Sequence, residues 1–285
     1  MTIDVVIVAY NSAGVIDRCL KAVGEVAGLA SVTVVDHGAQ PSVADAIHDP
    51  SNPGYGAGQN RGRAAGHAPY VLMLNPDAEV DAGGVAAGVA LLDARPDVAM
   101  VQGVVESHDG APERSAGRAL GPVHLWGRAL KLRALLDVPV VRRVAARIPA
   151  LSDHAERRPS SATEVEALAA VAVLARRAAL DEVGGFDAEH YFLYGEDADL
   201  CLRLRRAGWK LMALPDRWAV HISGASSASS WERELEWWRG TLAYGRRWWS
   251  PQARLAADAA AVVMVGRLAA RRPRQARRAL ALLRR

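Results

Sequence analysis

In the first hundred residues, the spacing of the hydrophobic positions alternates between that of a β-strand and that of an α-helix. Short β-branched runs at 3–9, 32–35 and 70–74 are bounded by polar or small residues, which is typical of buried parallel strands. Apolar residues between the first two runs recur at helical spacing, a small-residue helix is predicted over 82–94, and a further strand near 98–101. This alternation of strand and helix predicts a doubly wound, mostly parallel α/β sheet.

The rest of the chain is less uniform. Residues 106–160 carry Gly and Pro residues around Arg- and Leu-rich patches, which predicts a mobile loop with one or two helices. Regularity returns at 168–221, where an apolar run precedes two helices and then two strands near 211–214 and 218–221. Residues 231–249 predict an amphipathic helix rich in aromatic side chains.

The composition limits the class of protein. With 285 residues, 51% of them hydrophobic, the chain can form one large α/β domain or two small ones. The two cysteines, Cys19 and Cys201, give no disulfide framework or cysteine-rich zinc site, and they fit a reducing compartment. No signal peptide precedes the first strand, and the apolar run at 255–265 is too short for a membrane span. We therefore expect a cytoplasmic protein.

The positive charge is concentrated at one end of the chain. The formal net charge is +4, and no acidic residue follows Asp258. Eight arginines occupy that last stretch, so the basic balance describes a tail and not a nucleic-acid-binding body. They are Arg267, Arg271, Arg272, Arg274, Arg277, Arg278, Arg284 and Arg285.

Polar residues follow three predicted strands where each strand ends. They are Ala9, Tyr10 and Asn11, then Asp36, and then Asn75 and Asp77. Because ligands bind beyond the carboxyl ends of parallel strands, these residues can converge on one ligand. Asp36 could accept a hydrogen bond from a pyrimidine imide or a ribose hydroxyl, and Asp77 could bind a divalent cation. Both also have an ordinary interpretation as turn-forming residues.

A glycine-rich turn at 52–61 is predicted to open a helix. Gly54, Gly56 and Asn60 in such a turn would let backbone N–H groups approach a phosphate. The turn lacks the P-loop ending and the G-x-G-x-x-G spacing, so an ordinary flexible loop is the alternative.

Two further positions could carry chemistry. Glu196 and Asp197 open a predicted helix directly after the aromatic Tyr194, and Asp197 is placed to act as a general base. The helix dipole alone could also explain carboxylates there. His221 ends an apolar strand, where it is either a metal ligand or a structural histidine.

In their order along the chain, these segments resemble the family 2 inverting glycosyltransferases of the GT-A fold, especially the rhamnosyltransferase-like branch. The resemblance spans about residues 3–226. It rests on VIVAYNS, VVDHGA, NPGYGAGQNRG, LNPDAEV, VGGFDAEHYFLYGEDADLCLRLRRAGW and VHISGAS, of which the two long strings at 52–62 and 183–209 are the most specific.

The resemblance implies a role for each matching residue. Asp36 would contact the pyrimidine of a dTDP- or UDP-sugar donor, and Asp77 would bind Mg²⁺ or Mn²⁺ as the last carboxylate of an Asp-X-Asp motif. His221 would complete the metal site, while Asp197, beside Glu196, would deprotonate the acceptor hydroxyl. Tyr194 and Trp209 are predicted to contact the acceptor, a glycan or a lipid-linked molecule.

Two departures leave alternatives open. Asn75 replaces the first carboxylate of the metal motif, and Ala169 and Ala170 stand where relatives carry a Gly-Ala pair. A nucleotidyltransferase of sugar phosphates, or an inactive nucleotide-sugar-binding protein, are the alternatives to a glycosyltransferase.

The domain prediction separates a catalytic domain from a tail. Residues 1–230 form the catalytic domain, with a nucleotide-sugar half at 1–105 and a catalytic half at 160–226. Residues 231–285 form a helical extension whose tryptophans and arginines favour contact with the inner face of a membrane. Packing on the catalytic domain or a homodimer contact are the alternatives.

Overall fold

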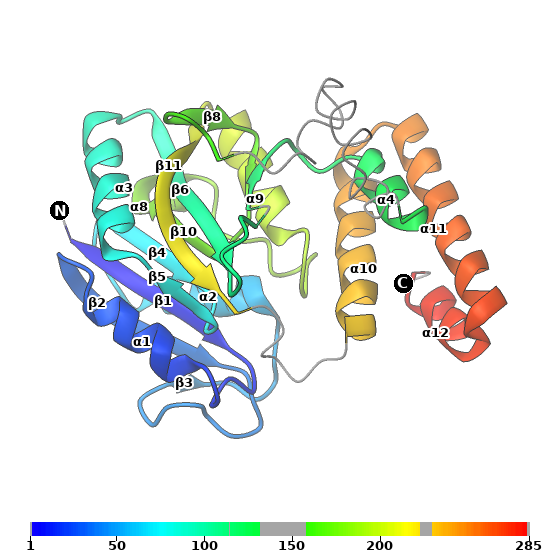
Figure 1. Cartoon of the computed structure of the whole chain (residues 1–285), viewed down its shortest axis with the longest axis horizontal. Coiled ribbons are helices and arrows are strands. Elements are labelled where there is room, and N and C mark those ends of the chain that lie inside the picture. The colour runs from blue at the N-terminus through cyan, green and yellow to red at the C-terminus, as the bar shows by residue number, and fades with distance from the viewer. Residues whose placement is uncertain (1, 114, 132–157, 223–229, 284–285) are drawn as a thin grey trace. The chain divides into compact units, whose positions relative to one another are not determined.

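The computed structural model describes residues 2–113, 115–131, 158–222 and 230–283. The chain divides into two compact units (Figure 1), and each is described by itself. The sheet unit comprises residues 1–118, 158–192 and 196–227; the helical unit comprises residues 119–157, 193–195 and 228–285.

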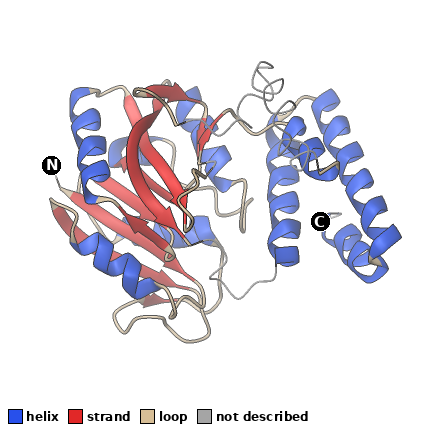
Figure 2. Ribbon diagram, in the orientation of Figure 1, coloured by secondary structure: helices blue, strands red, loops and turns tan. Residues whose placement is uncertain are grey.

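The sheet unit is built on a nine-stranded sheet (Figure 2). The strand order is β3-β2-β1-β4-β10-β6-β11-β5, and β8 pairs with β11 outside this path. The strands are β1 (Ile3–Ala9), β2 (Leu29–Asp36), β3 (Ile47–His48), β4 (Tyr70–Leu74), β5 (Ala78–Val80), β6 (Val98–Ser107), β8 (Thr163–Val165), β10 (Ala172–Arg176) and β11 (Lys210–His221). A separate two-stranded ribbon joins β7 (Ala116–Gly117) and β9 (Ala167–Leu168).

The predicted mostly parallel sheet is confirmed. β1 runs parallel to both β2 and β4, and β6 runs parallel to β11. β10 lies between β4 and β6 and is antiparallel to both, so β4 and β6 point the same way. The carboxyl ends of β1, β2, β4, β6 and β11 therefore lie along one edge of the sheet.

Helices cover both faces of this sheet, because its strands are apolar on both sides. Along β1, Val5 and Ile7 join one core cluster with residues of α1 (Ile16–Gly24) and α3 (Ala82–Ala94), whereas Val6 joins another. That second cluster contains residues of α8 (Arg177–Glu182) and α9 (Glu196–Arg206). α2 (Tyr55–Ala64) packs closely on the same side, since a Cβ at Gly62 would lie 2.3 Å from Val6 Cγ1.

One predicted pair of strands is wrong in detail. The expected strands near 211–214 and 218–221 form the single strand β11, whose register against β6 shifts between Ala213 and Arg217. Such an irregularity accommodates Pro215, which has no backbone N–H for a ladder hydrogen bond, without ending the strand.

The helical unit contains α4 (Pro122–Ala129), α10 (Ser230–Trp248), α11 (Pro251–Arg271) and α12 (Pro273–Leu283). Its core joins Leu125 of α4, Trp238 and Leu242 of α10, and Ala260 and Met264 of α11. α4 lies in the region where one or two helices were expected, and the remainder of that prediction, at 132–157, lies outside the described residues. No helix in the described part of the chain is long and apolar enough to cross a membrane.

Candidate active site

The turn after β4 and the end of β11 bring three side chains together. His221 Nε2 lies 3.3 Å from Asp77 Oδ1, and His221 Nδ1 lies 2.8 Å from Glu113 Oε2. β5 joins these segments by pairing with β11, where His221 faces Ala78, and Ile222 donates a backbone hydrogen bond to the Asp77 carbonyl. The predicted neighbours Asp77 and His221 are thus in contact, and Glu113 is a third member that the sequence did not indicate.

The two carboxylates favour the charged form of His221. Burial lowers the pKa of the imidazole, but the hydrogen bonds and charges of Asp77 and Glu113 outweigh it and raise the pKa to about 9. One imidazolium between two carboxylates leaves the cluster with a net negative charge, and a cation that binds Nε2 would displace the proton from that atom.

The same geometry fits a divalent ion held by Asp77 and His221. Two adjacent ligands of an octahedral Mg²⁺ lie about 3 Å apart, close to the observed separation of the carboxylate oxygen and Nε2. Glu113 would then accept the Nδ1 proton, the partner that metal-bound histidines commonly have. Among the described residues, no group of three or more His, Cys, Asp or Glu can hold a metal ion. Further ligands would therefore come from a bound diphosphate and water.

Two carboxylates open α9. Glu196 is buried, and its Oε2 atom has no hydrogen-bond partner in the described structure. Burial, together with the charge of Asp197, raises the pKa of Glu196 to about 8. Burial also raises the pKa of Asp197, but backbone N–H groups of Ala198 and Ala170 oppose this by bonding the carboxylate. Burial thus favours the protonated form of both carboxyl groups, whereas the backbone N–H groups favour the charged form of Asp197.

The turn before β10 links the Asp77 and Asp197 segments. Val171 accepts a hydrogen bond from the Asn75 backbone N–H at 2.8 Å, and Ala170 bonds the Asp197 carboxylate. The Tyr55 hydroxyl donates to the Ala170 carbonyl at 2.6 Å. Burial raises the pKa of Tyr55, and the charges of Glu196, Asp197 and Asp77 raise it further. One turn thus contacts the Asn75 backbone, the Asp197 carboxylate and the Tyr55 hydroxyl.

Close packing accounts for two glycines of the glycine-rich turn, and their contact with a donor phosphate stays a prediction. Gly54 has φ +104°, and a Cβ there would lie 2.3 Å from the Phe192 carbonyl oxygen. A Cβ at Gly56 would lie 2.9 Å from Phe186 Cβ. The Asn60 side chain makes two hydrogen bonds to the backbone of Phe186, one donated and one accepted. The Asn60 amide thus braces the fold, and its contact with the donor stays a prediction.

The first two strand ends form a structured loop. Asp36 is buried, and its two carboxylate oxygens each accept a 2.7 Å bond, from Gly38 N and Ser42 N. Ala9 pairs with Asp36 across the sheet, and the following Tyr10 and Asn11 are exposed. Asp36 therefore shapes this loop, and its contact with a nucleotide base stays a prediction.

The two residues predicted to contact the acceptor, Trp209 and Tyr194, belong to different units of the structure. Trp209 directly precedes β11, so it lies at the opposite end of that strand from His221, and its Nε1 donates to Glu182 at 2.9 Å. It is not part of the edge that carries Asp77. Tyr194 belongs to the helical unit, three residues before Asp197.

Comparison with known proteins identifies the family. The model described as glycosyltransferase like family 2 matches residues 2–240. The chain belongs to this family. The glycosyltransferase is 29% identical to the N-acetylglucosaminyl-diphospho-decaprenol L-rhamnosyltransferase of Mycobacterium tuberculosis, a match that covers 69% of this chain and 70% of the relative. A shorter match, 38% identical over 27% of this chain and 29% of the relative, is to rhamnosyltransferase WbbL of Escherichia coli. The rhamnosyltransferase-like branch is thereby confirmed.

Solved structures confirm the GT-A fold of this glycosyltransferase. The mannosyltransferase PcManGT of Pyrobaculum calidifontis, solved with GDP-Man and Mn²⁺, aligns with a TM-score of 0.57 at 15% identity, over 98% of this chain and 74% of its own. GalNAc-T7, solved with UDP, GalNAc and Mn²⁺, aligns with a TM-score of 0.61 at 14% identity, over 88% and 48%.

Glu113 and Tyr55 are the site residues to which sequence reasoning gave no role. Glu113 stands in a stretch without periodicity, 108 positions from His221, so no local pattern links the two. Tyr55 was included only as part of the glycine-rich turn. Its place at the start of a helix beside the sheet edge was the one available signal.

Replacing Glu196 by Gln is expected to stabilise the glycosyltransferase increasingly as pH rises. The unfolded carboxyl ionises near its ordinary pKa of 4.5, whereas the folded carboxyl keeps its proton to about pH 8. Between these values the folded state binds more protons, so the free energy of unfolding falls as pH rises. Gln does not titrate, so the variant should lack this decrease in the free energy of unfolding.

The measurement is the melting temperature of Glu196→Gln relative to wild type at about pH 5 and about pH 9. We expect the difference to grow in favour of the variant at the higher pH. The exposed Glu189→Gln serves as control and should show no such trend. A pH-independent difference for Glu196→Gln would contradict the assignment.

Proposed function

We propose that this glycosyltransferase is an inverting enzyme that moves a sugar from a nucleoside diphosphate donor to an acceptor hydroxyl. The observation that carries the proposal is that one turn holds both carboxylate segments: Val171 accepts from the Asn75 backbone N–H, and the neighbouring Ala170 bonds the Asp197 carboxylate. A group that binds the donor diphosphate and a group that takes the acceptor proton must face one reacting carbon. The shared turn supports this arrangement.

The chain's own residues have separate tasks in the transfer. Asp197 accepts the proton of the acceptor hydroxyl, and the oxygen attacks the anomeric carbon on the face opposite the diphosphate. The bond to the diphosphate breaks in the same displacement, which inverts the configuration. Burial raises the pKa of Glu196, which favours the neutral form of this neighbour of Asp197. Asp77 and His221 would hold Mg²⁺ or Mn²⁺, which when bound stabilises charge on the leaving diphosphate.

We propose dTDP-L-rhamnose as donor and a lipid-linked glycan diphosphate as acceptor. The mycobacterial relative is an N-acetylglucosaminyl-diphospho-decaprenol L-rhamnosyltransferase, which supports the rhamnosyl group of the donor and the lipid-linked acceptor. UDP-sugars are the next donors to consider. We retain residues 1–230 as the catalytic domain, and a homodimer stays a prediction.

The proposal is tested by donor binding to the purified full chain. We expect dTDP-rhamnose to raise the melting temperature in the presence of Mn²⁺ or Mg²⁺, more than UDP-GlcNAc or GDP-mannose do, and EDTA to remove the effect. Metal-dependent release of free sugar from the donor would separate an active enzyme from an inactive binding protein. No stabilisation by any sugar nucleotide with either metal would overturn the proposed function.

We also propose that the helical unit rests on the inner face of an anionic membrane. Leu255 and Val262, two turns apart on α11, are each 71% exposed, and Arg274, Arg277 and Arg278 lie on the exposed side of α12. Co-sedimentation with anionic vesicles should fall when the three arginines are replaced by Gln. Equal sedimentation of the wild type and the triple variant would contradict the proposed membrane contact.

A further inference from the structure

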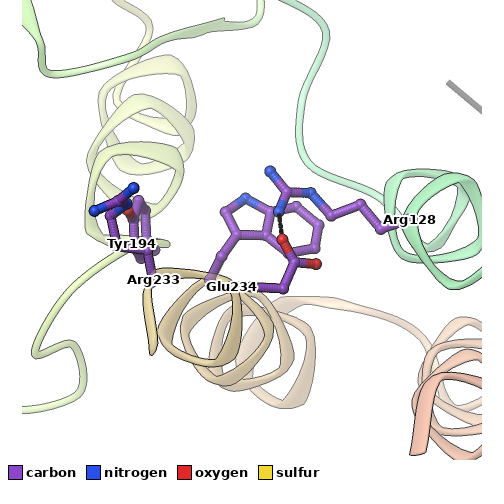
Figure 3. A pocket seen from close by; sticks show the side chains of 5 residues that line it. Arg128, Tyr194, Arg233 and Glu234 are labelled. Carbon is purple, nitrogen blue, oxygen red and sulfur yellow. Dashed lines mark hydrogen bonds and ion pairs between the residues drawn. The ribbon is translucent and has the colours of Figure 1, made fainter. Parts of the chain in front are cut away.

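The helical unit contains a polar cavity that the reaction described above does not use. Its volume is about 220 Å³, and most of its lining comes from α4 and α10 (Figure 3). Arg128 comes from α4, and Arg233, Glu234 and Trp237 come from the first two turns of α10. Tyr194, from the 193–195 segment, completes the lining.

Positive charge is in excess in this cavity. Arg128 forms an ion pair with Glu234, drawn as a dashed line in Figure 3, and its guanidinium lies 3.9 Å from the centre of the Trp237 ring. Trp238 Nε1 donates to the other Glu234 oxygen at 3.0 Å, so this carboxylate is fixed from two sides. The lining thus holds two guanidinium groups and one carboxylate, a formal charge of +1, and the Arg233 side chain lies beside Tyr194 (Figure 3).

Tyr194 is held firmly against α10. It has φ +64°, and a Cβ at Gly240 would lie 1.9 Å from its carbonyl oxygen, so only glycine allows this approach. Only three peptide units separate Tyr194 from Asp197, which limits the distance between their Cα atoms to about 11 Å.

We propose that this cavity binds the phosphate-bearing part of the acceptor, in an inference that rests on the proposed function. Guanidinium groups donate paired hydrogen bonds to phosphate oxygens, and Arg233 and Arg128 would do so here. The Trp237 and Tyr194 rings offer apolar faces for the chain or sugar attached to the phosphate. A neutral acceptor would gain nothing from the excess positive charge.

The proposal is tested by calorimetric binding of farnesyl diphosphate to the full chain in EDTA, which removes any metal-dependent binding at the donor site. Arg233→Gln is expected to weaken binding about tenfold, the loss typical of one charged hydrogen-bonding partner. Glu234→Gln is expected to tighten binding, because it removes the carboxylate that competes with the phosphate for Arg128. Arg246→Gln, an exposed arginine further along α10, is the matched control and should bind as wild type does.

Further ligands and a conservative variant separate the possible causes. Inorganic pyrophosphate should give the same ranking of variants at lower affinity, and farnesol should not respond to Arg233→Gln. Arg233→Lys keeps the charge and should fall between wild type and Arg233→Gln. Equal binding by Arg233→Gln and Arg246→Gln, or weaker binding by Glu234→Gln, would overturn the proposal. Donor stabilisation by Mn²⁺ and dTDP-rhamnose, measured on the same variants, reports separately on the proposed function.

Discussion

Replacing Asp197 by Asn is expected to lower the turnover of sugar transfer by about 10²- to 10⁴-fold, the usual contribution of a positioned general base. Asn keeps the size of the side chain and an oxygen that can accept the Ala198 N–H bond, so the start of α9 should remain folded. It cannot take a proton from the acceptor. Donor affinity should stay nearly unchanged, since Asp77 and His221 are intact.

The measurement pairs steady-state transfer kinetics with donor binding by calorimetry. The pH profile adds an independent check. In the wild type, kcat/KM should fall as pH drops through the raised pKa of Asp197. In Asp197→Asn this decrease of kcat/KM at low pH should be absent. Asp216→Asn, at an exposed position of β11, is the control and should transfer sugar normally. Turnover of Asp197→Asn within a few-fold of wild type would remove Asp197 from the role of base.

Replacing Glu113 by Gln is expected to raise the Mn²⁺ concentration needed for half-maximal activity by about 10- to 100-fold, the loss typical when the partner of a metal-bound histidine is changed. Glu113 acts as a positioning residue, because its contact is with His221 Nδ1 and not with the metal. The neutral amide leaves the imidazole less basic and less firmly oriented. At saturating Mn²⁺, turnover should recover most of its wild-type value.

Metal titrations of activity and of donor-induced stabilisation measure this effect. Asp77→Asn should show a larger loss that added metal does not restore, because it removes a proposed ligand itself. Glu164→Gln, exposed on β8, is the matched control. If Glu113→Gln shows the wild-type metal dependence, the imidazole does not act as a ligand supported by Glu113.

Much of the sheet unit was predictable from local pattern. Buried β-branched runs predicted β1, β2 and β4, since a parallel strand covered on both faces must be apolar on both sides. Strand β11 was predicted as two pieces because Pro215 and Asp216 interrupt the apolar run, although pairing with β6 carries the chain through. Ladder hydrogen bonds to a neighbouring strand are not visible in a one-dimensional pattern.

The candidate site was predictable only in part. Asp77 and Asp197 were found because each stands where an element begins or ends, a position that local sequence marks. Glu113 and the use of Gly54 and Gly56 were not, because each depends on a segment more than a hundred residues away. Such pairs follow from which strand ends and loops become neighbours when the sheet assembles.

The sequence alone thus determined the alternation of elements, the charged tail and the two aspartates, since all are consequences of residues close together in the chain. Tertiary structure alone decided that His221 lies between two carboxylates, that Trp209 lies at the far end of β11, and that two arginines share a cavity with Tyr194. The physical reason is that the sequence pattern indicates which face of a helix or strand is buried, whereas the packing of the folded chain decides which residues contact that face.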